Sequence, residues 1–312
     1  IFQAVLILHC RTSSLSSMKP SDLIQAIIVV IIWGFNFVVI KTAVAEIPPL
    51  ALTAIRFTFV ALLIAPFFRP TKQQLPKIAW LALILGCGHF GMLFIGLRGA
   101  DAATTALMIQ LGIPFSVILA TLLFSDSLGW GRVVGMLLAF TGAALLAGEP
   151  QGATPLALGA LLISAFCWAW ANILIKQYSS IHSMTIIGWM SLFAIAPLSA
   201  ASYFLESNQL TAIQSASWTT WAALAYIVIG SSILAYYIWY RLLARLSINQ
   251  VVPFSLLAPM IGVTAGILIL DEAFTLYKAL GGALTIGGVA LIEIRQARSR
   301  RLALLSSPIK LP

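Results

Sequence analysis

The nonapeptide WGFNFVVIK occupies residues 33–41, and a second nonapeptide, WAWANILIK, occupies residues 168–176. Each begins with Trp, ends with Lys eight positions later, contains an Asn and is otherwise apolar. The two Trp residues and the two Lys residues are both 135 positions apart (168 − 33 and 176 − 41). A match at this distance indicates that the chain contains two copies of one structural unit.

The composition of the chain sets its class. Of its 312 residues, 61% are hydrophobic and only 9% are charged, with a mean hydropathy of +1.01, whereas about 25% of the residues of a soluble domain are charged. The charges form short clusters between apolar runs of roughly 18–24 residues, the length with which a helix crosses ~30 Å of hydrocarbon. These runs lack the alternation of a membrane β-barrel. The sequence therefore predicts an all-α polytopic membrane protein.

Ten apolar runs are predicted to be transmembrane helices. They cover residues 23–44, 49–67, 77–97, 102–124, 130–148, 155–177, 184–205, 218–240, 249–270 and 277–295. The connections between them are short, and many contain Pro, Gly, Asp or Glu, so no segment is long enough for a soluble domain.

Landmarks beyond the nonapeptides recur in the same order in both halves. They are IAPFF (64–68) with IAPLS (195–199), GIPFSVILATLLFSD (112–126) with LAPMIGVTAGILILDE (257–272), and Gly135/Gly142 with Gly281/Gly288. Helices one to five thus recur as six to ten, in repeats over residues 18–150 and 151–297. Because a five-helix unit ends on the side opposite to its start, its copy must run the other way. The sequence predicts two inverted repeats with a substrate site near the midplane.

The positions of Lys and Arg predict the orientation. With the N-terminus placed inside, 14 of the 18 basic residues fall on the inner side, and Arg56 lies within a helix. Basic residues are retained in the cytoplasm, so both termini are expected there. This accounts for the net charge of +9 without a nucleic-acid partner. The basic tail, residues 298–312, is expected to hold the last helix beside anionic lipid of the bilayer.

Residues 1–17 do not fit this scheme. Their apolar part is too short to span a membrane, and they lack the basic region that precedes a signal-peptide core. Met18 opens MKPSDLIQAIIVV, a short basic start before the first helix. We therefore expect residues 1–17 to be a non-native or disordered extension.

The motifs in this order resemble the EamA-type branch of the drug/metabolite transporter superfamily. The resemblance rests on WGFNFVVIK, on PPLALTAIRF (48–57), and on a Pro…Asp/Glu…Gly…Gly series at 114–142 and 259–288. It covers Met18 to about Arg295, with Asp126 in the first repeat where the family usually has Glu.

This resemblance implies a transporter of the bacterial inner (plasma) membrane that exports small amino-acid-like metabolites, such as cysteine or O-acetylserine, by alternating access. Drugs, nucleobases and other metabolites stay open as alternative substrates. A channel or an intramembrane enzyme is less favoured, because no ion filter or nucleophile–base pair is recognisable. Cys10, Cys87 and Cys167 show no paired or metal-ligand spacing, so no disulfide, metal or cofactor is expected.

Arg56 is the leading candidate for a substrate-binding residue. It lies seven residues after Pro49 in an apolar helix, where an ionisable group costs ~2.5–3.5 kcal/mol and usually faces a cavity or a partner. Its guanidinium could hold a carboxylate through two parallel hydrogen bonds. The alternative is a structural Arg that caps carbonyls or pairs with Glu46 or Asp101.

His89 lies in LGCGHFGML, in the middle of the third predicted helix. Because an imidazole titrates near neutral pH, His89 could carry a proton in an exchange cycle. The alternative is a neutral His that is hydrogen-bonded to a neighbouring helix. No acidic residue lies deep in a predicted span, so proton coupling depends on His89, and transport is otherwise facilitated diffusion.

Other polar and aromatic residues are candidates for the wall of the substrate path. The alternatives are packing in the core, aromatic belts, or snorkelling of Lys41 to the membrane surface. Pro114 and Pro259 lie at matching mid-span positions and are candidate hinges. The candidate wall residues are Trp33, Asn36, Lys41, Gln110, Trp168, Asn172 and Tyr236.

Two GxxxG spacings bear on the oligomeric state. Gly131/Gly135 and Gly262/Gly266 fit either close packing inside one monomer or the face of a homodimer. The sequence leaves both readings open.

Overall fold

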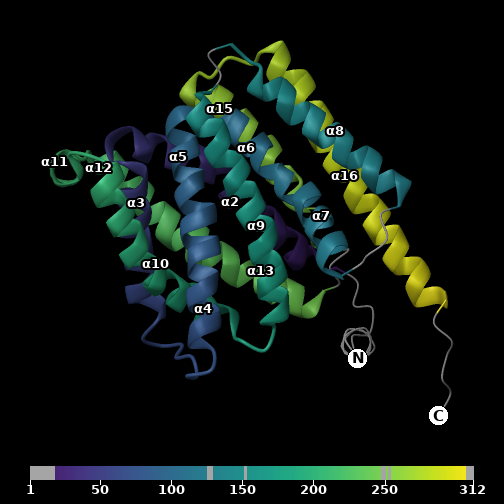
Figure 1. Cartoon of the computed structure of the whole chain (residues 1–312), viewed down its shortest axis with the longest axis horizontal. Coiled ribbons are helices and arrows are strands. Elements are labelled where there is room, and N and C mark those ends of the chain that lie inside the picture. The colour runs from purple at the N-terminus through teal and green to yellow at the C-terminus, as the bar shows by residue number, and fades with distance from the viewer. Residues whose placement is uncertain (1–17, 125–128, 151–152, 247–250, 252–253, 307–312) are drawn as a thin grey trace.

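The computed structural model describes residues 18–124, 129–150, 153–246, 251 and 254–306 (Figure 1). The segment 1–17, Cys10 and Asp126 therefore lie outside the described residues. Within the described ranges every regular element is helical, and the β-type pairing is a single bridge between Ala100 and Ala153.

The elements run through the chain in the following order. They are α2 (Pro20–Glu46), α3 (Pro49–Ile64), α4 (Leu75–Leu81), η1 (Ala82–Gly91), α5 (Met92–Gly99), α6 (Ala102–Met108), η2 (Ile109–Leu111), α7 (Gly112–Phe124), α8 (Trp130–Ala147), α9 (Pro155–Gln177), α10 (Ser183–Leu205), α11 (Gln209–Ser215), α12 (Trp218–Ala225), η3 (Tyr226–Leu234), α13 (Ala235–Arg245), α15 (Leu257–Leu270) and α16 (Leu276–Ser306). Of the short elements, η1 and η3 are π-helical and η2 is a 3₁₀-helix.

Eight helices or continuous helical runs are long and apolar enough to cross a membrane. They are Pro20–Glu46, Leu75–Gly99, Ala102–Leu123, Trp130–Ala147, Pro155–Gln177, Ser183–Leu205, Trp218–Trp239 and Leu276–Gln296. The apolar helices α3 and α15 have 16 and 14 residues, shorter than the ~20 that a span usually needs. The chain is therefore a multi-pass helical membrane protein.

Two predicted spans contain an irregularity, and one physical reason accounts for both. In the ninth predicted span, 249–270, α15 begins at Leu257 after a turn at Leu256, and the described residues 251, 254 and 255 before that turn are also helical. Likewise, the 3₁₀-helix η2 separates α6 from α7 within the fourth predicted span. Pro259 and Pro114 each lie at the third position of the helix that follows the irregularity. Proline lacks an N–H and its ring clashes with the carbonyl four residues back, so an α-helix does not continue through it unchanged.

The last helix is longer than predicted. α16 continues to Ser306, past the predicted end at residue 295. The added residues, QARSRRLALLS, are mostly good helix formers. The first part of the predicted tail 298–312 is therefore helical.

Segments far apart in the sequence pack together. α2 contacts α15, α12 and α13, while α9 contacts η1, α5 and α7, and α3 contacts α10. Figure 1 shows α8 and α16 side by side along one edge of the molecule.

Glycines bring α8 and α16 into backbone contact. A Cβ built on Gly142 would lie 2.5 Å from the Gly281 carbonyl oxygen, and one on Gly135 would lie 2.7 Å from that of Gly288. The two glycine pairs recognised in the sequence thus meet each other. Of the GxxxG residues, Gly131 faces Arg295 and Gly262 faces Ala106 and Phe37, which are contacts inside one molecule.

Three glutamates close one end of the bundle. Glu46 and Glu206 end or follow α2 and α10, and Glu272 follows α15; each accepts two hydrogen bonds at the start of a remote helix. The first N–H groups of a helix have no intrahelical partner and carry partial positive charge, so a carboxylate stabilises them. We call this the capped end. Its bonds are Leu50 N and Ala51 N to Glu206 (2.8 and 3.0 Å), Ala102 N and Ala103 N to Glu272 (2.6 and 3.0 Å), and Ser217 N and Oγ to Glu46 (both 2.7 Å).

The glycine contact between α8 and α16 predicts a position-specific effect of adding one methyl group. Gly288→Ala places a Cβ against the Gly135 carbonyl oxygen and 2.6 Å from the Ala139 nitrogen. We expect a loss of about 1–3 kcal/mol from overpacking, seen as a lower midpoint of thermal unfolding in detergent. The matched control is Gly287→Ala, whose Cβ meets nothing within 4 Å and should leave the midpoint equal or higher. Equal midpoints for the two variants would contradict this packing.

Candidate functional site

Arg56 lies on α3 at the centre of the candidate site. Its side chain is only 1% exposed, and its Nε and Nη2 atoms donate to Ser232 Oγ at 3.1 and 3.0 Å. The guanidinium carbon lies 4.3 Å from the centroid of the Phe90 ring, within the range of a cation–π contact. Nη1 is buried and has no hydrogen-bond partner. Arg56 is thus a desolvated cation with one donor atom unused.

The ion pairs considered for Arg56 are not formed. Glu46 accepts from Ser217 at the capped end. Asp101 is paired with Lys278 Nζ at 2.6 Å. Both hydrogen bonds of Arg56 go to the Ser232 hydroxyl rather than to carbonyl oxygens. Among the described residues, therefore, no carboxylate neutralises Arg56.

A cavity of about 50 Å³ brings four of the predicted site residues together. Arg56, Trp168, Asn172 and Tyr236 line it, although they come from α3, α9 and α13. The remaining lining residues are Phe57, Val60, Leu85, Phe90, Ile175, Ile186, Ile187, Met190, Ser191 and Ser232. The cavity is much smaller than the ~300–1,000 Å³ of typical ligand pockets, so the structure shows the site in a constricted state.

Part of the cavity wall lies on the side away from the capped end. Ile175 lies two residues before the end of α9, and Ile186 and Ile187 lie in the first turns of α10. The far end of α10 carries Glu206 of the capped end. The cavity thus extends from Arg56 toward the end of the bundle opposite to the glutamate caps.

Trp33 supports the cavity wall from behind. Its ring centroid lies 5.2 Å from that of Tyr236 and 5.2 Å from that of Trp239. Its Nε1 donates to the Ser231 carbonyl at 3.4 Å. Trp33 therefore packs behind Tyr236 and is not itself a lining residue.

His89 lies behind Trp168 and does not line the cavity. The two rings are 4.8 Å apart between centroids, and His89 is 4% exposed. Nδ1 lies 3.1 Å from the Ser164 carbonyl oxygen, while Ser164 Oγ donates to the His89 carbonyl at 2.9 Å. A neutral imidazole with its proton on Nδ1 donates to the Ser164 carbonyl, whereas the bond from Ser164 Oγ is accepted by the backbone carbonyl of His89. These reciprocal bonds join η1 to α9.

Asn172, in the cavity wall, donates to the Trp168 carbonyl at 2.9 Å. The remaining predicted residues are dispersed. Asn36 on α2 has a buried Oδ1 without a partner, and Gln110 lies half-buried in η2. Lys41 donates to the Ala100 carbonyl at 2.7 Å, so it belongs to the capped end and is separate from the cavity.

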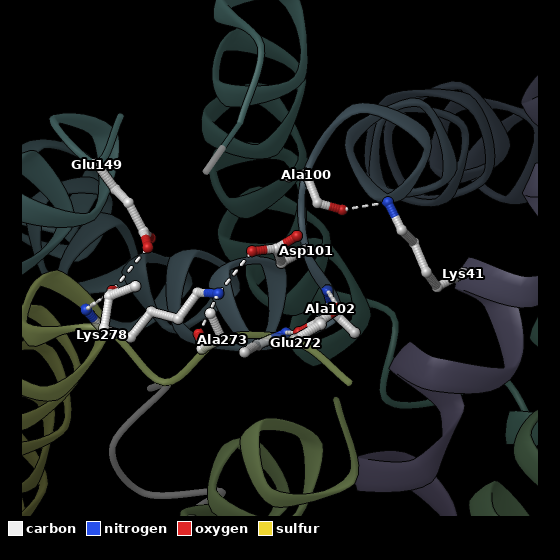
Figure 2. Close-up of polar contacts among 10 residues, drawn as sticks. Lys41, Ala100, Asp101, Ala102, Glu149, Glu272, Ala273 and Lys278 are labelled. Carbon is white, nitrogen blue, oxygen red and sulfur yellow. Dashed lines mark hydrogen bonds and ion pairs between the residues drawn. The ribbon is translucent and has the colours of Figure 1, made fainter. Parts of the chain in front are cut away.

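Figure 2 shows the polar network in which Lys41 takes part. Lys278 is 3% exposed and bonds both Asp101 and the Ala273 carbonyl, the latter at 2.8 Å. Glu149 accepts from Thr275 at 2.6 Å. These contacts join the start of α16 to the segments before α6 and after α8, so they reinforce the capped end.

Ser232 and Phe90 contact the Arg56 guanidinium, and sequence reasoning missed both. Both lie in π-helical segments, Phe90 in η1 and Ser232 in η3. π-Helical turns are rare and frequently lie at functional sites, but tertiary contacts select them and no local sequence motif predicts them. The available signal was the polar pair Ser231–Ser232 inside an otherwise apolar predicted span.

The ionisable and thiol groups of the described residues do not form the ligand set of a metal site. No group of three His, Cys, Asp or Glu residues there could hold a metal ion. Cys87 and Cys167 are both free thiols. The polar groups near the cavity are suited to binding and orienting a ligand.

Comparison with known proteins identifies the family. A protein about 31% identical over 87% of this chain and 94% of its own length is named "Probable amino-acid metabolite efflux pump" in Escherichia coli K12. A protein named "Probable terminal-alkyne amino-acid exporter" in Streptantibioticus cattleyicolor is 25% identical over 92% of this chain and 98% of its own length. A crystal structure that is 19% identical superposes with a TM-score of 0.59 over 91% of this chain and 99% of its own, which shows a shared fold.

The family model itself matches twice. The EamA-like transporter family covers residues 21–148 and again residues 155–294, one match in each half of the chain. This confirms the resemblance seen in the motifs and indicates a transporter rather than an enzyme. The chain belongs to the EamA-like transporter family.

Proposed function

We propose that this protein exports small amino-acid-like metabolites, such as cysteine or O-acetylserine, and that Arg56 binds the substrate carboxylate. The observation that carries the proposal is the buried guanidinium at the cavity, which has no carboxylate partner among the described residues. A buried charge without a counter-ion is unfavourable. A ligand carboxylate would neutralise it and fill the unused donor at Nη1.

The charge of Arg56 also separates the candidate substrate classes. A cationic drug would be repelled by a desolvated guanidinium, and a neutral nucleobase would leave it unneutralised. The names of the efflux pump and of the alkyne amino-acid exporter both refer to amino acids, which supports the zwitterionic class. Trp168 and Tyr236 supply apolar walls for the remainder of such a ligand.

The architecture that we propose is ten spans in two inverted repeats. The two family matches support it, as do the π-helical segments, which fall in the third and the eighth predicted spans. The helix contacts support it as well, because α2 packs on α15 as α9 packs on α7, and α12 packs on α2 as α5 packs on α9. Exchanging each helix for its counterpart in the other half leaves this set of contacts unchanged.

We further propose transport by alternating access, with the capped end facing outward. The distribution of basic residues supports that orientation, with both termini in the cytoplasm of a bacterium. The glutamate caps then close the outer side, whereas the cavity reaches toward the cytoplasmic ends of α9 and α10. This arrangement suits the state of an exporter that loads its substrate from inside.

For His89 we propose a structural role. Its reciprocal bonds with Ser164 use the imidazole to join two helices, and it does not line the cavity. Export then proceeds without a proton carrier at this position, as facilitated diffusion does.

Replacing Arg56 tests the carboxylate role. We expect Arg56→Gln to lower export of amino acids at least tenfold, because a hydrogen bond to a charged group contributes about 1.5–3 kcal/mol. The measurement is a scan of the medium of overproducing cells for accumulating metabolites, at equal expression. The control is Arg98→Gln, which removes an exposed guanidinium. Undiminished export by Arg56→Gln would refute the role.

The variants His89→Ala and Ser164→Ala test the role of His89. We expect Ser164→Ala to lower the thermal midpoint, since it removes a buried hydroxyl bond worth about 1–3 kcal/mol, and His89→Ala to lower it further, because it also removes the ring that packs on Trp168. Both should keep the wild-type response of export to an imposed pH gradient. Loss of that response in His89→Ala alone would make His89 the proton carrier.

Weakening one cap tests the orientation of the closed state. Glu272→Gln replaces one accepting oxygen by an amide NH₂, which cannot accept from the N–H groups of Ala102 and Ala103. We expect severalfold faster labelling of Asn172→Cys, in a background without the native cysteines, by an impermeant maleimide added outside.

The matched control for this experiment is Asp271→Asn. Asp271 is exposed and has a φ of 53°, which Asn also tolerates, so the change removes the same charge without removing a cap. Equal labelling rates in both variants would show that the Glu272 cap does not close the outer side.

A further inference from the structure

The hydroxyl of Ser232 uses its full hydrogen-bonding capacity. It donates to the Ile227 carbonyl at 2.7 Å and accepts from Arg56 Nε and Nη2. A serine hydroxyl has one donor and two acceptor sites, so no capacity remains for a substrate. Ser232 is therefore a fixed support for Arg56 and does not act as a ligand-binding group.

The π-helical turn of η3 accounts for the direction of this hydroxyl. Ser232 bonds the carbonyl five residues back, whereas Ser191, which lines the same cavity on the α-helix α10, bonds the Ile187 carbonyl four residues back. The wider turn changes the direction of the side chain relative to the helix axis. It brings the oxygen of Ser232 onto one edge of the guanidinium.

The bonds to Ser232 determine which edge of the Arg56 guanidinium stays available for a ligand. Guanidinium donors lie in one plane, and Ser232 takes the edge formed by Nε and Nη2. Phe90 covers the face of that plane at 4.3 Å. What remains is the edge formed by Nη1 and the second N–H of Nη2, the geometry that binds a carboxylate through two parallel bonds. Nη1 is buried in this constricted state, so a ligand reaches it when the cavity widens.

We infer that Ser232 is a positioning residue for substrate selectivity, which holds one edge of Arg56 so that the opposite edge meets a carboxylate. The inference rests on the proposed function, because it assigns to Ser232 the orientation of the carboxylate-binding group. It predicts that the hydroxyl is needed for discrimination between ligands with and without a carboxylate, beyond any need for folding.

The test measures that discrimination directly in purified protein. A panel of the twenty amino acids and O-acetyl-L-serine is screened by ligand-induced shifts in thermal midpoint. The strongest ligand is then compared with the amine that lacks only its carboxylate, such as cysteine with cysteamine. The readout is the ratio of the two dissociation constants in each variant.

The variants isolate the hydroxyl. We expect Ser232→Ala to lower the ratio at least tenfold, and Ser232→Thr, which keeps a hydroxyl, to restore it to within about threefold of wild type. Ser232→Cys has nearly the same volume and a weak acceptor, so it tests the same point if Ser232→Ala fails to fold. The control is Ser231→Ala, because Ser231 is similarly buried, at 3% against 4%, and its carbonyl, which the substitution keeps, accepts from Trp33.

The outcomes separate the two proposals. If wild type binds no amino acid, or does not prefer the carboxylate, the proposed function fails and the inference fails with it. If Arg56→Gln abolishes the preference while Ser232→Ala and Ser232→Cys keep it, Arg56 binds the carboxylate unaided and the role of Ser232 is refuted. An equal loss in Ser231→Ala would also refute it, because the effect would then belong to the helix as a whole.

Discussion

A hydrocarbon environment offers no hydrogen bonds, so each helix that starts near it needs partners for its first N–H groups from within the protein. For α3, α6 and α12 those partners are carboxylates from remote parts of the chain, as in the bonds of Glu206 to Leu50 and Ala51. Because each cap joins distant parts of the chain, satisfying the backbone also fixes how helices meet at one end. The arrangement of helices at the capped end follows from this requirement.

The same requirement makes Arg56 exceptional. Ser191, which lines the same cavity, is satisfied by its own helix, yet the guanidinium keeps one donor atom unused in a buried position. Phe90 and Ser232 stabilise the cation without neutralising it. On the proposed function, an anionic ligand would complete this site.

Much of this arrangement could be predicted from the sequence, because apolar runs and recurring motifs are local signals. The glycine pairs and the breaks before Pro114 and Pro259 follow from sterics that each residue carries with it. Arg56 could be recognised from the sequence because placing a charged side chain within an apolar membrane segment costs free energy in any fold. Ser232 did not, since its importance depends on a π-helical turn and on a contact 176 residues away. The place of Lys41 could not be predicted for the same reason, since its carbonyl partner at Ala100 is set by the tertiary fold.

The glycine contact between α8 and α16 has a mechanical consequence. One helix belongs to the first half of the chain and the other to the second, and their backbones touch at Gly135–Gly288 and Gly142–Gly281. Backbones in contact leave few flexible side chains between the helices to take up a displacement. We expect any rotation of one half against the other to pivot along this seam, with the largest displacement on the side of the molecule farthest from it.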